Sequence, residues 1–359
     1  MTDQPATFAP DYAFPPGDTL RSKLSELGMT QTDLADRLGM SEKHVSHMMK
    51  GNAPLTYETA VALERITGVP ASTWNGLESH YRDHLLREKL STVGPNEAEW
   101  LSLLPLATLQ ERGYISDATP NGRTLGETLR FFAVADIKAW TKVWSQPIAS
   151  FRRSGAHAVN AEATATWLRI GEIKAQEIDC QDFDASALRK LLPTLRKLTR
   201  STDFIHQLVQ LCATVGITVV LESEVSGSRI HGASRWLTPR KALIQLTDRQ
   251  KKEDIFWFSF FHEIGHLLLH SKKASYIHDG SEDSFIEDEA NEFARDLLIP
   301  PKWLDRLMET RTHAEIQLLA DEIGVSTGIL AGRLARDNIN GWNWAKVGKL
   351  RKPMCISDN

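Results

Sequence analysis

The chain has 359 residues, a length typical of about two to three domains, and its 42 Lys and Arg against 46 Asp and Glu give a formal net charge of −4. This balance gives no overall bias toward binding nucleic acid or a membrane. Three scattered cysteines, Cys180, Cys212 and Cys355, form no paired framework and no metal-binding spacing, so we expect reduced thiols. Residues 1–17 carry no export signal, and no apolar run reaches the length of a membrane span. These features predict a flexible tail on a cytoplasmic, multidomain protein that does not bind membranes.

Residues 18–78 have the spacing of a helix-turn-helix domain. A small residue stands where two helices would cross, a glycine can supply the positive φ of the turn, a serine can cap the next helix, and a valine can pack between the two helices. In order, these residues are Ala35, Gly39, Ser41 and Val45. With a first helix from about Asp18 to Leu27 and further helices after Thr56 and Pro70, the pattern resembles the lambda-repressor-like (XRE) domain of HigA-type antitoxins.

In this geometry the second helix of the pair lies in the major groove, so its exposed side chains are candidate DNA contacts. Lysines can bind phosphates, histidines can reach base edges, and a glutamine at the start of the preceding helix can contact the backbone. The candidates are Gln31, Ser41, Lys43, His44, Ser46, His47 and Lys50. Because acids and bases nearly balance over residues 18–68, we expect modest affinity per monomer and a homodimer that reads a palindromic operator. A domain used only for protein contacts is the alternative.

Residues 79–200 are predicted to form a helical connector. Apolar residues recur at helical spacing over residues 100–109, 125–144, 161–178 and 185–198. Four tryptophans occupy positions typical of packing between helices. They are Trp100, Trp140, Trp144 and Trp167. The residue chemistry of this segment indicates no function of its own, so we interpret it as a connector that orients the two ends of the chain.

The strongest chemical signal is an apolar helix that contains His262, Glu263 and His266. Histidines four residues apart project to nearly the same side of an α-helix, about 40° from each other, so both imidazoles can bind one tetrahedral Zn²⁺. The carboxylate of Glu263 then lies beside the metal, where it can take a proton from a water molecule. Residues 255–261 and the leucines after His266 would bury this helix on nearly all sides, so its polar groups need partners. The motif indicates metal-dependent hydrolysis.

A catalytic zinc site needs a third protein ligand, which we expect on a helix from residue 285 to the stop at Pro300. Glu287 lies at the edge of the apolar stripe of this helix and is the preferred ligand, whereas Glu289, about 200° away, is the competitor. Asn291, one turn after Glu287, can hold a liganding histidine by a hydrogen bond. We interpret the remaining acids as a solvated face. They are Asp288, Glu289 and Glu292.

This pattern resembles the ImmA/IrrE family of metallopeptidases, whose known members cleave repressor or antitoxin proteins. The resemblance rests on His262-Glu263-Ile264-Gly265-His266 and on residues 287–300, and extends to residues 232–237 and 241–246, which are similar to strands of the branch fused to a DNA-binding domain. It implies that His262, His266 and Glu287 bind Zn²⁺, with Mn²⁺ as the other metal considered, and that Glu263 is the general base. Spacing identifies no oxyanion stabiliser. The candidates by proximity in sequence are His231, Arg235 and Tyr276.

The expected fold is mainly α with a small antiparallel sheet, an α+β class. Strands are predicted near residues 217–221, 228–236 and 242–247, after a helix over residues 204–215. We expect residues 201–310 to form a zincin-like metallopeptidase domain. An edge strand of its sheet can pair with an extended substrate peptide.

Residues 311–359 are predicted to form a helical extension with a basic tail. Residues 316–330 repeat the spacing of the first helix-turn-helix, with four residues in matching places. They are Ala320, Gly324, Ser326 and Leu330. The second helix of this pair carries Gly328 and Gly332, so we expect it to pack against the peptidase, or to grip a protein substrate, rather than to read DNA.

Together these features predict a DNA-binding zinc metallo-endopeptidase that cleaves a partner repressor or antitoxin and so couples proteolysis to transcription control. A cognate toxin would be a further partner. The alternative is a non-catalytic transcriptional regulator, or the antitoxin of a toxin-antitoxin system, whose peptidase-like domain serves as a sensor or interaction module.

Overall fold

The computed structural model describes most of the chain. The described residues are 14–90, 92–145, 148, 160–249, 251–270, 276–278 and 285–354. The chain divides into two compact units, of which the first contains residues up to Pro95 and Asn121–Gly126, and the second contains Asn96–Pro120 and the residues from Glu127 onward. Within the described ranges, every helix is too short or too polar to cross a membrane.

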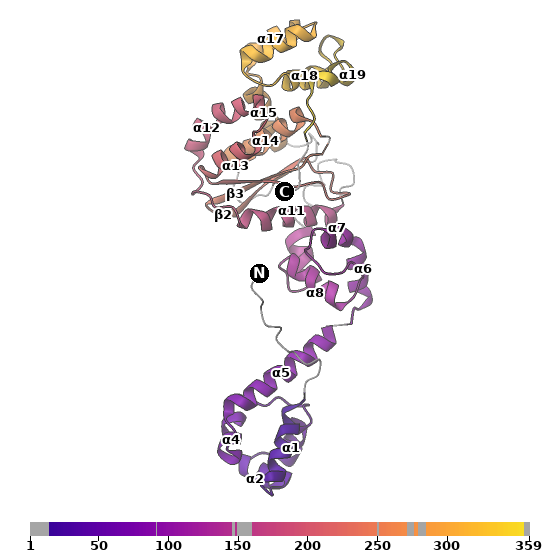
Figure 1. Ribbon diagram of the computed structural model, residues 1–359, viewed down its shortest axis with the longest axis vertical. Helices are drawn as coiled ribbons and strands as arrows, with labels where there is room; N and C mark the ends of the chain where they lie inside the picture. Colours follow the sequence, from indigo (N-terminus) through magenta and orange to yellow (C-terminus); the bar gives the residue numbers. More distant parts are fainter. Residues whose placement is uncertain are drawn as a thin grey trace. The chain divides into compact units, whose positions relative to one another are not determined.

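The first unit contains five consecutive helices (Figure 1). They are α1 (Pro16–Glu26), α2 (Gln31–Leu38), α3 (Glu42–Met49), α4 (Tyr57–Thr67) and α5 (Ala71–Leu90). Their apolar side chains form one core, in which Leu34, Val45 and Trp74 are fully buried. Because Trp74 belongs to this core, the first part of α5 is part of the helix-turn-helix domain. Residues 1–13 of the expected tail lie outside the described residues.

The turn between α2 and α3 has the predicted geometry. Thr30 and Asp33 cap α2 reciprocally, and Gly39 adopts a φ of 68°, in the left-handed region that favours glycine. The hydroxyl of Ser41 accepts a hydrogen bond from the backbone N–H of His44 at 3.2 Å and so caps α3. The helix-turn-helix predicted from sequence is therefore confirmed.

Short helices follow, and in the second unit aromatic residues pack between them. The helices are α6 (Pro95–Leu103), α7 (Leu106–Glu111), α8 (Gly122–Phe131) and α9 (Ile137–Trp140), with a π-helical turn at Thr141–Ser145. The ring of Phe132 lies 6.4, 5.8 and 5.7 Å from the rings of Trp100, Trp140 and Trp144. All four tryptophans predicted to be packing residues, Trp167 included, are buried.

A four-stranded sheet lies at the centre of the second unit. Its strands are β1 (Ile217–Leu221), β2 (Gly232–Thr238), β3 (Lys241–Leu246) and β4 (Tyr276–His278), in the order β1-β3-β2-β4. The α+β class is confirmed, but the prediction of an antiparallel sheet is wrong for one pair, because β1 runs parallel to β3. The pairs β2–β3 and β2–β4 are antiparallel. The short turn after β2 makes β3 antiparallel to β2 and places it between β2 and β1, which runs in the same direction as β3.

Helices cover both faces of this sheet (Figure 1). They are α11 (Ala161–Gln176), α12 (Ala185–Lys197), α13 (Ile205–Ala213) and α14 (Glu253–Leu269). Side chains alternate along the strands, so that Ile217 and Ile244 join the core of α12, α13 and α14, whereas Val220 and Leu243 pack against Ala175 of α11. Burial on both faces explains the nearly continuous apolar sequence of β1 and β3.

The connector expected over residues 79–200 does not stand apart from the sheet. On α11, the carbonyl of Trp167 accepts a hydrogen bond of 2.7 Å from the amide of Gln245 on β3, which is fully buried. After β1, the carboxylate of Glu222 lies 2.6 Å from both Arg112 and Lys174. These polar contacts fix α7 and α11 to the sheet.

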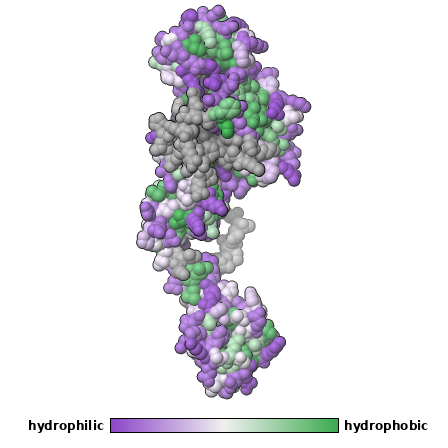
Figure 2. Space-filling view, turned by 180° about the vertical axis from the view of Figure 1, so that it is seen from behind, coloured by the Kyte–Doolittle hydropathy of each residue, from purple (hydrophilic) through white to green (hydrophobic). Residues whose placement is uncertain are grey.

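The C-terminal part consists of helices, of which α15 and α18 pack on α14. They are α15 (Phe285–Leu298), α16 (Leu304–Glu309), α17 (His313–Ile323), α18 (Thr327–Arg336) and α19 (Trp344–Val347), with 3₁₀ turns at Leu198–Arg200, Pro301–Trp303, Ile339–Gly341 and Gly348–Leu350. The predicted second helix pair is present as α17 and α18, because Gly324 has a φ of 83° and Ser326 stands at the N-cap of α18. On the face shown in Figure 2, hydrophobic residues form separate patches within a largely hydrophilic surface.

As expected, the second helix of this pair packs inward, since α18 lies against α14. The glycines Gly328 and Gly332 face the buried carboxylates of Glu253 and Asp254, and a Cβ at either glycine would clash with the carboxylate. Asp254 is held by Arg351, whose Nε lies 2.9 Å from both carboxylate oxygens. The glycines of α18 are therefore required for close packing.

Candidate metal centre and DNA-binding helix

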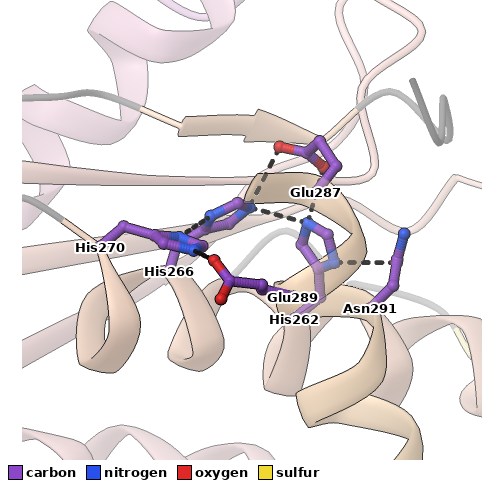
Figure 3. Close-up of polar contacts among 6 residues, drawn as sticks. All are labelled: His262, His266, His270, Glu287, Glu289 and Asn291. Carbon is purple, nitrogen blue, oxygen red and sulfur yellow. Dashed lines mark hydrogen bonds and ion pairs between the residues drawn. The ribbon is translucent and has the colours of Figure 1, made fainter. Parts of the chain in front are cut away.

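The candidate metal ligands lie on α14 and α15, which pack closely together. A Cβ at Gly265 would lie 3.2 Å from the Cα of Ala290, so a glycine allows this approach. His262 and His266 are fully buried on α14. The side chain of Glu287, on α15, is 13% exposed and faces them (Figure 3).

Three ligand atoms converge at this place. The Nε2 atoms of His262 and His266 are 2.9 Å apart and lie 3.1 and 3.3 Å from the two carboxylate oxygens of Glu287. One ligand atom from each residue can be chosen so that all three lie within 4.8 Å of one another. Two imidazole nitrogens and one carboxylate oxygen are the donor set typical of a catalytic zinc site, so these residues fit the metal predicted from sequence.

The hydrogen bond of His262 favours the tautomer that a metal requires. With its proton on Nδ1, the ring donates to Oδ1 of Asn291 at 3.1 Å and directs the lone pair of Nε2 toward Glu287 (Figure 3). Burial lowers the pKa of His262, although Glu287 opposes this effect, and so favours the neutral imidazole, the form that can bind a metal. The structure places Asn291 as the sequence predicted, on the ring nitrogen that faces away from the ligand cluster.

His266 also has a hydrogen-bond partner that can orient its ring, and this partner, His270, was not predicted from the sequence. The Nδ1 atoms of His266 and His270 lie 2.9 Å apart, and Nε2 of His270 lies 3.2 Å from Glu289 (Figure 3). If His266 donates through Nδ1, His270 can accept this hydrogen bond and donate through Nε2 to Glu289, and the lone pair of Nε2 of His266 then points toward Glu287, where a metal would bind. Glu289, interpreted above as a solvated acid, is therefore a partner of His270. The i to i+4 spacing of His266 and His270 was the available signal.

Glu263 lies fully buried between α14 and β2. Neither carboxylate oxygen forms a hydrogen bond of normal geometry with a described residue, although the nearby hydroxyl and N–H of Ser234 lower its pKa somewhat. Burial has the larger effect and raises the pKa of Glu263 well above its ordinary value, and the charge of Glu287 raises it further. A Cβ at Gly232 would lie 3.0 Å from Oε1 of Glu263, so β2 approaches the carboxyl group closely. Such an isolated acid is costly for folding and typical of a reactive site.

The candidates for an oxyanion stabiliser are not equivalent in the structure. Arg235 is wrong as a candidate, because its guanidinium lies 3.6 Å from Glu172 and 5.2 Å from the ring of Trp144. Side chains alternate on β2, so Arg235 and Ser234 face opposite sides of the sheet. His231 precedes β2 and lines a cavity beside the ligand cluster. For Tyr276 the structure gives only the backbone position, which is opposite Ser234 in the pairing of β4 with β2.

The candidate DNA contacts lie on the outer face of α3. Six of the seven are exposed and one is half-buried. The exposed ones on this helix and its caps are Ser41, Lys43, His44, His47 and Lys50, and Ser46 is half-buried. Gln31 is also exposed, but its amide donates to the carbonyl of Glu42 at 3.4 Å. Gln31 therefore fixes the start of α3, a role that the sequence did not predict.

Two family models match this chain. Residues 20–74 match the model of a helix-turn-helix, and residues 212–335 match that of the IrrE N-terminal-like domain, which is a peptidase family. No curated protein matches the chain. The predicted combination is confirmed: the chain joins a DNA-binding helix-turn-helix domain to a metallopeptidase-like domain.

Proposed function

We propose that this protein, with its helix-turn-helix and its IrrE N-terminal-like domain, is a zinc-dependent endopeptidase that cleaves a partner regulator. The observation that carries the proposal is the buried convergence of His262, His266 and Glu287 next to the isolated carboxyl group of Glu263. The resemblance to the ImmA/IrrE family supports a repressor or antitoxin as the partner.

The chemistry follows from the positions of the side chains. Zn²⁺ held by His262, His266 and Glu287 would polarise a peptide carbonyl and acidify a water molecule. Glu263 accepts the proton of the attacking water and passes it to the leaving amide nitrogen, so that no covalent enzyme intermediate forms. Asn291 and His270 keep the two ligand imidazoles in the required orientation.

The sheet offers a place for an extended substrate. β4 is an edge strand, and both β4 and β2 contact α14. A substrate segment that pairs with this edge would bind mainly through its main chain, which allows different sequences to be accepted. The orientation of the peptide is then fixed by the sheet rather than by the metal ligands.

The helix-turn-helix domain would bring this activity to DNA. The outer face of α3 presents two lysines and two histidines against one glutamate, which supports phosphate and base contacts in the major groove. We propose a homodimer that binds a palindromic operator, so that cleavage of the partner alters transcription at the same promoter.

A comparison of the wild type with Glu263→Gln tests the enzymatic proposal. The variant keeps all three ligands, so it should bind zinc as the wild type does and lose derepression of the target promoter in cells. Zinc content is measured by elemental analysis of both purified proteins. Equal derepression by both proteins, each with zinc bound, contradicts the peptidase proposal and favours a non-catalytic regulator.

A further inference from the structure

A cavity of about 280 Å³ lies beside the candidate metal centre. Its wall includes Ile255 and Phe258, which lie on the face of α14 that carries His262 one turn later. The ring of Phe258 is 6.2 Å from that of His262. Asn291, which holds Nδ1 of His262, also lines the cavity, so this space lies beside the first of the two ligand histidines.

The size and lining of the cavity fit a large apolar group. Its floor contains Leu298, Ile299 and Ile329 from α15, the segment after it and α18. A protein cavity of roughly 150 Å³ with such a lining admits a benzene molecule. The cavity beside α14 therefore has room for an aromatic or branched aliphatic side chain.

The residues that line the cavity include three arginines and two aspartates, an excess of positive charge. Its two carboxylates are already paired, Asp254 with Arg351 and Asp337 with Arg333. Within the described part of the chain, the guanidinium of Arg295 makes neither an ion pair nor a hydrogen bond. An unpaired arginine in the lining of a largely apolar cavity favours a ligand that carries a carboxylate next to its apolar group.

We propose that this cavity is a specificity pocket, which receives a bulky apolar side chain of the substrate while Arg295 pairs with an adjacent carboxylate. The inference rests on the proposed function and adds a substrate class to it. The substrate would carry an aromatic or branched residue next to an acidic residue, close to the bond that is cleaved.

Hydroxamates test the pocket without requiring turnover, because the hydroxamate group binds zinc and positions the rest of the molecule. The probes are acetohydroxamate, 3-phenylpropionohydroxamate and the hydroxamate of benzylmalonic acid, each titrated calorimetrically into the zinc-loaded full chain. We expect the phenyl group to improve affinity about 10- to 100-fold, from the burial of a side chain of this size. The added carboxylate should improve it by a further factor of about 10.

Variants show which residues produce these increases in affinity. Ile255→Trp fills the cavity and should abolish the gain from the phenyl group, whereas Leu269→Trp, on the exposed side of the same helix, should keep it. Arg295→Gln should lose the carboxylate gain and Arg295→Lys should retain part of it. Zinc content and circular dichroism show whether each variant is folded.

The outcomes separate the two proposals. If the protein binds no zinc, both the proposed function and the pocket are overturned. If acetohydroxamate binds but the phenyl group adds no affinity, or if the gain survives Ile255→Trp, only the pocket is overturned.

Discussion

Replacing a glycine of α18 by alanine should destabilise the protein, although helix propensity alone predicts stabilisation. Alanine at Gly332 should stabilise an isolated helix by about 0.5–1 kcal/mol. In the folded protein its Cβ would lie 3.1 Å from Cγ of Asp254 and closer still to Oδ2. Asp254 cannot turn away easily, because Arg351 binds both of its carboxylate oxygens. Overpacking of this kind costs about 1–3 kcal/mol, so we expect Gly332→Ala to lower the free energy of unfolding by roughly 1–2 kcal/mol.

Thermal unfolding followed by tryptophan fluorescence measures this effect. Trp74 is the one tryptophan of the ten that lies in the first unit, so the signal reports chiefly on the second unit. The midpoint should fall by about 2–8 °C in a unit of this size. Gly348→Ala is the control, because Gly348 has helical φ and ψ and a Cβ there would meet no atom within 4 Å. If Gly332→Ala is as stable as Gly348→Ala, the close packing of α18 on Asp254 is refuted.

Three further perturbations test the site, the sheet and the DNA-binding helix. His270→Ala should weaken zinc binding about 10- to 100-fold in a chelator competition, because His266 loses its orienting partner, while the neighbouring surface change Asp288→Asn should leave it unaltered. Glu222→Gln should destabilise the second unit by about 1–3 kcal/mol in urea unfolding, less than for a fully buried pair because Arg112 and Lys174 are partly exposed. Lys43→Ala with Lys50→Ala should weaken DNA binding uniformly across sequences and reduce the salt dependence by about one ion per lysine. An unchanged zinc affinity, unfolding curve or salt slope would contradict the respective assignment.

The sequence predicted the parts of this protein that depend on local spacing. His262 and His266 are one turn apart on any helix, and Gly39 and Ser41 specify a turn and a cap regardless of what surrounds them. Glu287 could be preferred over Glu289 because helical periodicity places the two on different faces.

Features that depend on contacts between distant segments were not predictable. The parallel pairing of β1 with β3 follows from where the β2–β3 hairpin inserts, and α11 joins the sheet through Gln245, which follows Trp167 by 78 residues. The role of His270 required the position of Glu289 on another helix. The use of Gln31 as a support for α3 likewise depends on how α2 and α3 pack.

The central claim is that this chain hydrolyses a peptide bond in a partner regulator. The most direct test captures the partner with Glu263→Gln in cells and then adds zinc-loaded wild-type protein to the purified complex, with intact-mass spectrometry as the readout. We predict two fragments whose masses sum to that of the partner plus one water, and none with additional Glu263→Gln protein. A partner that stays intact with wild-type protein holding one zinc per chain would contradict the claim.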